Sequence, residues 1–197
     1  MVLKGLAATL GPEPDMEIVG LASTGDEAVR LFRDKKPDVM IMDLHLTPEM
    51  SGIEAMQAIR REFPDARVIV LSAHNGDEEI FRALQAGAIT YLLKDSLGDD
   101  LVPIIRQVHA GGGPIPAEVA RKLADRLSQP SLTTREIQIL QLVAEGMRNK
   151  ELAGQLGISE QTAQGHVKNI LAKLKVNDRT AAVTVALRRG IIHLANR

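Results

Sequence analysis

The segment from residue 132 to residue 176 constrains the fold most, because its apolar residues recur at helical spacing and glycines divide it into three short helices. The first predicted helix begins with a capping box, in which Thr133 and Glu136 satisfy each other's backbone N–H groups. The second is predicted to begin at a cap, Asn149, and to end at Gly157, and Ser159 is predicted to cap the third. The pattern indicates a small all-α domain.

The third predicted helix has two different faces. Apolar residues fall at helical spacing on one face: Ala163, Val167, Ile170, Leu171 and Leu174. Polar residues and a glycine lie off this stripe: Gln164, Gly165, Lys168 and Asn169. Two short helices joined by a glycine turn, the second with a polar outer face, are the layout of a helix-turn-helix that reads DNA in the major groove. We therefore favour DNA binding over a helical bundle with a solvated charged face.

The distribution of charge along the chain supports this interpretation. Residues 131–197 carry 10 Lys and Arg against 5 Asp and Glu, whereas residues 1–130 carry 14 against 20, and the whole chain has a net charge of −1. The basic part coincides with the predicted helix-turn-helix, as attraction to phosphates requires.

The first 110 residues alternate strand and helix patterns. Short apolar runs predict strands at 16–22, 39–42, 68–71 and 89–93. Amphipathic patterns between them predict helices at 24–35, 52–62, 77–86 and 99–110. Continuous apolar strands that alternate with helices indicate an α/β fold with a doubly wound parallel sheet, covered by helices on both faces. Ligands bind such sheets beyond the carboxyl ends of the strands.

Three polar residues stand at those ends. Asp43, Ser72 and Lys94 each follow an apolar strand pattern. A carboxylate can attack a phosphoryl donor and form an aspartyl phosphate, and an ammonium and a hydroxyl can hold the phosphate oxygens. A single Asp after a strand is more often a loop or cap residue, but three such groups on successive strands favour a phosphorylation site.

Both halves resemble known families. The C-terminal half matches the LuxR-type helix-turn-helix at these positions: Thr133, Glu136, Gly146, Asn149, Ile158, Ser159, Thr162, His166, Lys173, Leu174, Asn177 and Arg179. The runs MIMDLHL, VIVLSA and GAITYLLKDS resemble the receiver domain, which has a flavodoxin-like sheet. Together they resemble the NarL/FixJ subfamily of two-component response regulators. The resemblance implies that Asp43 is the phosphoacceptor, that Ser72 and Lys94 stabilise the phosphate, and that Tyr91 holds the aromatic switch position, although Tyr91 is equally readable as a core aromatic.

The resemblance also implies which residues meet DNA. Gln164 and Lys168 are expected to face base edges, and Lys173, Lys175 and Arg179 to contact phosphates. Thr162, His166 and Asn169 complete the predicted DNA-binding set. Gly165 is expected to add little, because it offers no side chain.

The chain departs from the receiver pattern at its start. The family begins with a strand that ends in two acidic residues, which bind Mg²⁺ beside the phosphoacceptor, and this chain opens instead at MVLKGLAATLGPEP. Mg²⁺ is therefore expected from the family but doubtful at Asp43, which lacks its acidic partners. Either a segment upstream of Met1 belongs to the protein, or the receiver has diverged and no longer depends on Mg²⁺. The loop DLHLTPEMSG is also one residue longer than usual.

The domain organisation follows from a break at GGGPIP, residues 111–116. We expect a receiver at 1–110, a linker at 111–131 with a helix at 117–127, and a helix-turn-helix domain at 132–197. The linker helix is as readily a plain helix packed on one domain as a regulatory element. By resemblance, a last helix at 179–190 forms a dimer face.

Several function classes are disfavoured. No apolar run approaches the length of a membrane span, and the absence of cysteine excludes disulfides and thiolate metal sites. No signal peptide is visible, and together with the bacterial-type motif this leads us to expect a cytoplasmic protein. The histidines lack metal-ligand spacing, and no Gly-rich phosphate loop or catalytic dyad indicates an enzyme. The expected function is a transcription regulator that binds DNA as a homodimer and is phosphorylated on Asp43 by a sensor histidine kinase. The alternative is a phosphorylation-independent DNA-binding regulator whose receiver is a dimerisation or partner-binding module.

Overall fold

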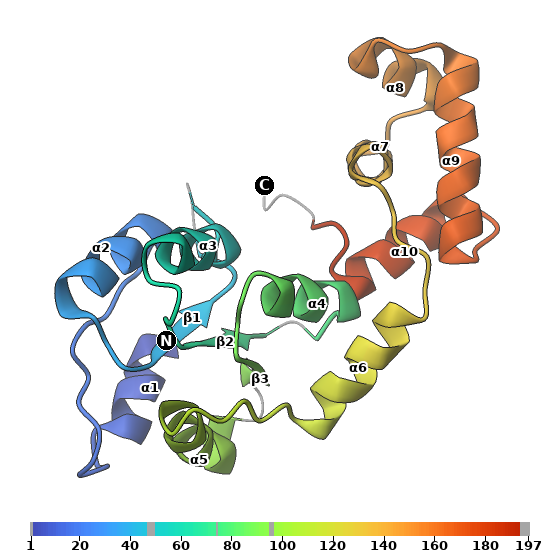
Figure 1. Cartoon of the computed structure of the whole chain (residues 1–197). Coiled ribbons are helices and arrows are strands. Elements are labelled where there is room, and N and C mark those ends of the chain that lie inside the picture. Colours follow the sequence, from blue (N-terminus) through green and yellow to red (C-terminus); the bar gives the residue numbers. More distant parts are fainter. Residues whose placement is uncertain (1, 47–49, 74, 95–96, 194–197) are drawn as a thin grey trace. The chain divides into compact units, whose positions relative to one another are not determined.

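The computed structural model describes residues 2–46, 50–73, 75–94 and 97–193 (Figure 1). The chain divides into two compact units. The N-terminal unit comprises Met1–His74 and Ile80–Ala120, and the C-terminal unit comprises Asn75–Glu79 and Arg121–Arg197. The predicted linker at 111–131 is therefore shared between the two units. None of the helices in the described part of the chain is both long and apolar enough to cross a membrane.

The N-terminal unit is built around a parallel sheet, as the sequence predicts. Its elements in chain order are α1 (Val2–Leu10), α2 (Gly25–Lys35), β1 (Met40–Asp43), α3 (Gly52–Glu62), β2 (Val68–Ser72), α4 (Asp77–Gln85), β3 (Thr90–Leu93) and α5 (Leu97–His109). Within the described ranges the sheet has three strands in the order β1-β2-β3, and both pairings are parallel. The first residues of α4 belong to the C-terminal unit.

Helices cover both faces of this sheet. Val68 and Val70 of β2 pack into a core shared with α2, α3 and α4, whereas Ile69 and Leu71 pack into a second core shared with α5. Leu6 of α1 packs against the second core. All five residues of β2 are buried, because β2 lies between β1 and β3 and is covered on both sides. This explains why the strand is a continuous apolar run rather than an alternating one.

The strand predicted at residues 16–22 is wrong. This segment has no regular secondary structure, and β1 has no ladder partner other than β2 among the described residues. An isolated extended segment cannot satisfy its backbone N–H and C=O groups by pairing, so an apolar pattern alone does not make it a strand. Ile18, Val19 and Leu21 are 38%, 40% and 50% exposed as a result.

Four helices make up most of the C-terminal unit: α7 (Thr134–Ala144), α8 (Asn149–Leu156), α9 (Glu160–Leu174) and α10 (Arg179–Arg189). They enclose a single cluster of buried apolar residues, among them Ile139, Leu152, Ile170 and Ala186. The predicted capping box is present at Thr133 and Glu136. Both Gly146 and the C-cap Gly157 have the positive φ that ends a helix, with φ of 92° and 64°.

One predicted cap is wrong. The N-cap of α8 is Arg148, not Asn149, and the Arg148 backbone N–H donates to Glu151 at 2.6 Å. Asn149 is instead the first residue of the helix, and its side-chain oxygen accepts a hydrogen bond from Arg179 at 3.1 Å. The predicted cap Ser159 does begin α9, where its hydroxyl accepts from the Thr162 N–H at 3.0 Å.

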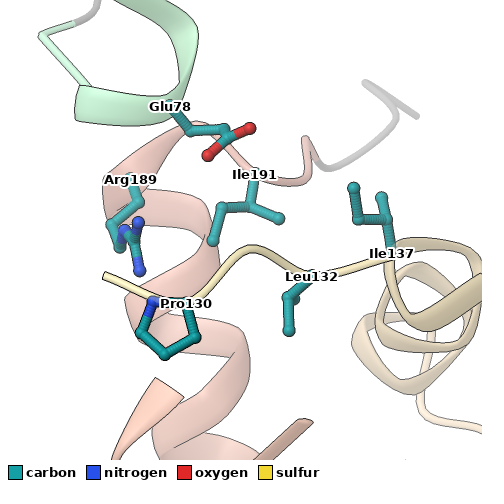
Figure 2. A pocket seen from close by; sticks show the side chains of 6 residues that line it. All are labelled: Glu78, Pro130, Leu132, Ile137, Arg189 and Ile191. Atoms are coloured by element: carbon teal, nitrogen blue, oxygen red, sulfur yellow. The ribbon is translucent and has the colours of Figure 1, made fainter. Parts of the chain in front are cut away.

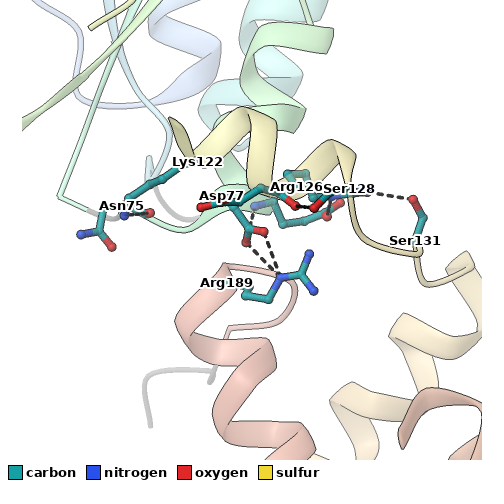
Figure 3. A network of polar contacts seen from close by, with 9 residues as sticks. Asn75, Asp77, Lys122, Arg126, Ser128, Ser131 and Arg189 are labelled. Carbon is teal, nitrogen blue, oxygen red and sulfur yellow. Dashed lines mark hydrogen bonds and ion pairs between the residues drawn. The ribbon is translucent and has the colours of Figure 1, made fainter. Parts of the chain in front are cut away.

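A polar network lies within the C-terminal unit (Figure 3). Arg189, in the last turn of α10, donates to Asp77 at 3.0 Å, and the buried Arg126 pairs with Glu78 and donates to Ser131 at 2.9 Å. A small pocket in the same unit is lined by Glu78, Pro130, Leu132, Ile137, Arg189 and Ile191 (Figure 2). The pocket includes neither Asp43 nor any residue of α9, so it is not part of either predicted site.

The linker helix α6 (Ala117–Leu127) has the predicted bounds. Its first turn belongs to the N-terminal unit, where Val119 is only 2% exposed and joins the core cluster of α2 and α3. The Thr90 hydroxyl of β3 donates to the Pro114 carbonyl at 2.5 Å. The segment before α6 is therefore attached to the sheet at Pro114, and the first turn of α6 packs into the core through Val119.

Candidate phosphoacceptor site and nucleic-acid interface

The carboxyl ends of the three strands bring together a carboxylate, a hydroxyl and an ammonium. Asp43 and Ser72 are the last residues of β1 and β2, and Lys94 directly follows β3. The Lys94 ammonium forms an ion pair with the Asp43 carboxylate, and the two side chains are 19% and 25% exposed. Parallel strands that end at the same edge place these groups together, as the sequence predicts.

Ser72 and Tyr91 lie deeper than this pair. Ser72 is fully buried, and the register pairs Asp43 with Leu71 and Ser72 with Leu93. Tyr91 is also fully buried and belongs to the core cluster on the side of α3 and α4. Its place in the core fits the reading of Tyr91 as a core aromatic and does not test the switch reading.

The backbone around Asp43 is tightly packed. The other Asp43 carboxylate oxygen accepts the His45 N–H at 3.1 Å. Gly52 begins α3 directly against β1, and a Cβ atom on Gly52 would lie 2.0 Å from the Asp43 carbonyl oxygen. A side chain at position 52 would therefore displace the backbone that carries Asp43. The longer loop noted in the sequence includes Thr47–Glu49, which lie outside the described residues.

The outer face of α9 carries the side chains predicted to read DNA. The side chains of Gln164, Lys168 and Asn169 are exposed, and none of these side chains forms a hydrogen bond or ion pair with another described residue. On the opposite face Ala163, Val167, Ile170 and Leu174 enter the core. Lys175 is also exposed and ends the helix in the left-handed conformation, with φ of 55°. These groups are therefore available to a ligand such as DNA.

Two other predicted DNA contacts, Thr162 and His166, are less available than these side chains. The Thr162 hydroxyl is 2.8 Å from the hydroxyl of the cap Ser159, so it takes part in the start of α9. His166 is half-buried.

Lys173 and Arg179 bind other helices of the unit. The Lys173 ammonium donates to the Glu136 carboxylate of α7 at 2.7 Å, and Arg179 donates to the Asn149 side chain of α8 at 3.1 Å. The sequence predicts only the capping-box role of Glu136 and not its contact with Lys173. No local pattern could have shown this contact, because 37 residues separate the two positions.

The two halves of the chain match known families. Residues 1–106 match the response regulator receiver domain, and residues 130–186 match the bacterial regulatory proteins of the luxR family. The chain belongs to the response regulator family.

Several response regulators resemble the chain over nearly its full length. It is 42% identical to the transcriptional regulatory protein LiaR of Bacillus subtilis strain 168, over 98% of this chain and 95% of that protein. It is 36% identical to the response regulator protein VraR of Staphylococcus saprophyticus, over 98% and 94%. Among solved structures, the response regulator ChrA of a heme-sensing two-component system is 34% identical, with a TM-score of 0.56 over 97% of this chain and 93% of that one. An RcsB–DNA complex is 25% identical, with a TM-score of 0.67 over 95% and 93%. This response regulator is thus a DNA-binding transcription regulator of a two-component system.

Response regulator receivers generally bind Mg²⁺ through acidic side chains. Asp43 supplies a carboxylate, but no group of three acidic or histidine side chains in the described ranges is arranged to hold a metal ion. Glu13 and Asp15 instead both accept hydrogen bonds from Arg106, at 2.6 and 2.8 Å. The hydrogen bond from Arg106 lowers the pKa of Asp15 to about 2. Among the described residues, no acidic pair therefore joins Asp43 in the three-carboxylate cluster expected of a receiver.

Proposed function

We propose that this response regulator accepts a phosphoryl group on Asp43 and that the phosphoryl group controls DNA binding by the outer face of α9. The observation that carries the proposal is the ion pair between Asp43 and Lys94 at the carboxyl ends of β1 and β3. A carboxylate next to an ammonium can act as the nucleophile toward a phosphoryl donor while the ammonium offsets the charge that gathers on the phosphoryl oxygens. The fully buried Ser72 ends the strand between them.

The exposure of the α9 side chains supports separate roles for them on DNA, in which some contact base edges and others contact phosphates. Lys168 and Gln164 can donate to guanine and adenine edges in the major groove, and both side chains are exposed on α9. Lys175 is exposed at the end of the helix and is placed to meet a phosphate, which fixes position without specifying sequence. The partners are DNA, a sensor histidine kinase that supplies the phosphoryl group, and a second copy of the chain.

A second candidate function keeps the DNA binding but not the phosphorylation. It is favoured by the donor set at Asp43, which in the described ranges does not assemble a magnesium site. In that case the N-terminal unit would act as a dimerisation or partner-binding module.

Treatment with a small acyl phosphate distinguishes the two functions. Wild-type protein and Asp43→Asn would be incubated with acetyl phosphate, with and without Mg²⁺, and followed by intact-protein mass and by DNA mobility shift. We expect one phosphoryl group on the wild type and none on Asp43→Asn, together with a change in DNA affinity. Because Lys94 supplies only one positive charge, phosphorylation should be slow and little affected by Mg²⁺.

Three results would contradict these expectations. Equal phosphorylation of Asp43→Asn, or phosphorylated wild type with unchanged DNA affinity, would support the phosphorylation-independent function. Rapid phosphorylation that requires Mg²⁺ would show that the ion is bound in spite of the donor set at Asp43.

A further inference from the structure

The Glu136 carboxylate binds two separate segments of the C-terminal unit, the start of α7 and the end of α9. The same Glu136 oxygen, Oε2, accepts the Thr133 backbone N–H at 2.7 Å and the Lys173 ammonium at 2.7 Å. Glu136 is 5% exposed and lies at the start of α7, whereas Lys173 lies in the last turn of α9. The pair therefore joins the beginning of one helix to the end of the helix that carries the DNA-reading face.

The burial of Glu136 argues against Lys173 as a phosphate contact. A phosphate could recruit the Lys173 ammonium only by drawing it away from Glu136, and the buried carboxylate would then lose its charged partner. The Lys175 ammonium can contact a phosphate without leaving a partner, because it is exposed and binds no other described side chain. The two lysines are two residues apart but have different surroundings.

The hydrogen bond between Lys173 and Glu136 restrains the rotation of α9 about its own axis. The core contacts of α9 form one apolar stripe through Ala163, Val167, Ile170 and Leu174. A stripe of non-directional contacts permits small rotations of a helix about its own axis, whereas a hydrogen bond off the stripe opposes them. Lys173 lies off that stripe, with its side chain 31% exposed.

We propose that Lys173 is a positioning residue, which acts through Glu136 to fix the angle at which α9 presents Gln164 and Lys168 to DNA. This inference rests on the proposed recognition of DNA by α9. It assigns Lys173 to the orientation of the reading helix and leaves phosphate contact to Lys175.

The test uses the full chain and two DNA duplexes of equal length, one enriched from a random pool by the wild-type protein and one of random sequence. Affinities would be measured by fluorescence anisotropy over a series of KCl concentrations for Lys173→Met, Glu136→Gln, the double variant and Lys175→Met. Glutamine can also serve in a capping box, so Glu136→Gln should keep the start of α7. Thermal melting would accompany each protein.

We expect Lys173→Met and Glu136→Gln each to weaken binding to the enriched duplex about tenfold, which corresponds to about 1.4 kcal/mol. The double variant should lose about the same factor, because the two substitutions break one interaction. The salt dependence should be unchanged in all three. Lys175→Met should instead weaken binding to both duplexes by the same factor. It should also lower the slope of log affinity against log salt concentration by about one, as loss of a phosphate contact does.

The inference would be overturned if Lys173→Met lowered the salt slope by about one, or if Glu136→Gln bound DNA as tightly as the wild type. Glu136→Gln tests the inference even if Lys173→Met fails to fold. If Lys173 contacted phosphate, removing the Glu136 charge would free its ammonium and should not weaken DNA binding. If Lys173 is a positioning residue, the same substitution should weaken it. A wild-type protein that enriches no sequence would overturn the proposed function itself and this inference with it.

Discussion

At the scale of single residues, two glycines are present for different reasons. Gly52 lies against the backbone of Asp43, where a Cβ atom would be 2.0 Å from the carbonyl oxygen. Gly165 lies on the outer face of α9, with nothing within 4 Å of the position of its Cβ. Glycine is therefore required by packing at position 52, whereas at position 165 it only weakens the helix.

Alanine at these two positions should have opposite effects on stability. Gly52→Ala should lower the free energy of unfolding of the N-terminal unit by roughly 1–3 kcal/mol, because the backbone of β1 must shift. Gly165→Ala should raise that of the C-terminal unit by roughly 0.5–1 kcal/mol. Urea denaturation measures both, by circular dichroism and by the fluorescence of Tyr91, the only tyrosine in a chain without tryptophan. Destabilisation by Gly165→Ala would show that the glycine has a structural role.

The Glu136 carboxyl links the stability of the C-terminal unit to pH. Burial raises its pKa, but the hydrogen bonds from Lys173 and Thr133 outweigh this effect, so the pKa lies below its ordinary value of 4.5. A carboxyl whose pKa is lower in the folded state stabilises the fold above its unfolded pKa, and this contribution is lost as the pH falls through the folded pKa.

The melting temperature should therefore fall on acidification below pH 4.5 by less in Glu136→Gln than in the wild type. Scanning calorimetry between neutral pH and about pH 3 would measure the difference. Identical acid sensitivity of the two proteins would mean that Glu136 does not contribute.

At the scale of elements, the sequence predicted most helices and strands because each has a local cause. The capping box at Thr133, the glycine end of α8 and the continuous apolar run of β2 can be recognised from neighbouring residues. The strand predicted at residues 16–22 is absent because a strand needs a neighbouring strand to pair with. An apolar pattern does not show whether that neighbour is present. The three chemical groups at the sheet edge were predictable, since parallel strands place their ends together.

Long-range contacts between charged groups were not predictable in the same way. The pairing of Lys173 with Glu136 and of Arg179 with Asn149 depends on how four helices pack. Sequence patterns identify lysines and arginines on a basic domain but do not separate those that face solvent from those that bind a neighbouring helix. Here that difference decides which side chains are available to DNA.

The linker helix α6 offers a test of its own, since its two ends differ in exposure. Val119 is 2% exposed within the N-terminal unit, whereas Leu127 is 65% exposed. Val119→Ala should lower the free energy of unfolding of the N-terminal unit by roughly 1–3 kcal/mol, because buried apolar surface is lost. The matched control Leu127→Ala should change it by less than about 0.5 kcal/mol. Equal effects in urea denaturation followed by Tyr91 fluorescence would show that the first turn of α6 is not part of this unit.

At the scale of the whole molecule, the chain combines a receiver domain, in which Asp43 pairs with Lys94, with a luxR-type DNA-binding domain. Residues 131–197 carry the excess of positive charge, which favours association with any DNA. In the proposed function, the exposed side chains of α9 supply the discrimination between sequences. A homodimer would double the contacts and require two half-sites about one helical turn apart.

The ratio of affinities for enriched and random DNA tests this account most directly. Wild-type protein should enrich sequences with two such half-sites and bind them at least about 10³-fold more tightly than a random duplex at physiological salt. Lys168→Ala should reduce this ratio through the loss of a base contact of roughly 1–3 kcal/mol. A wild-type ratio near one, or an unchanged ratio in Lys168→Ala, would contradict sequence recognition by the outer face of α9.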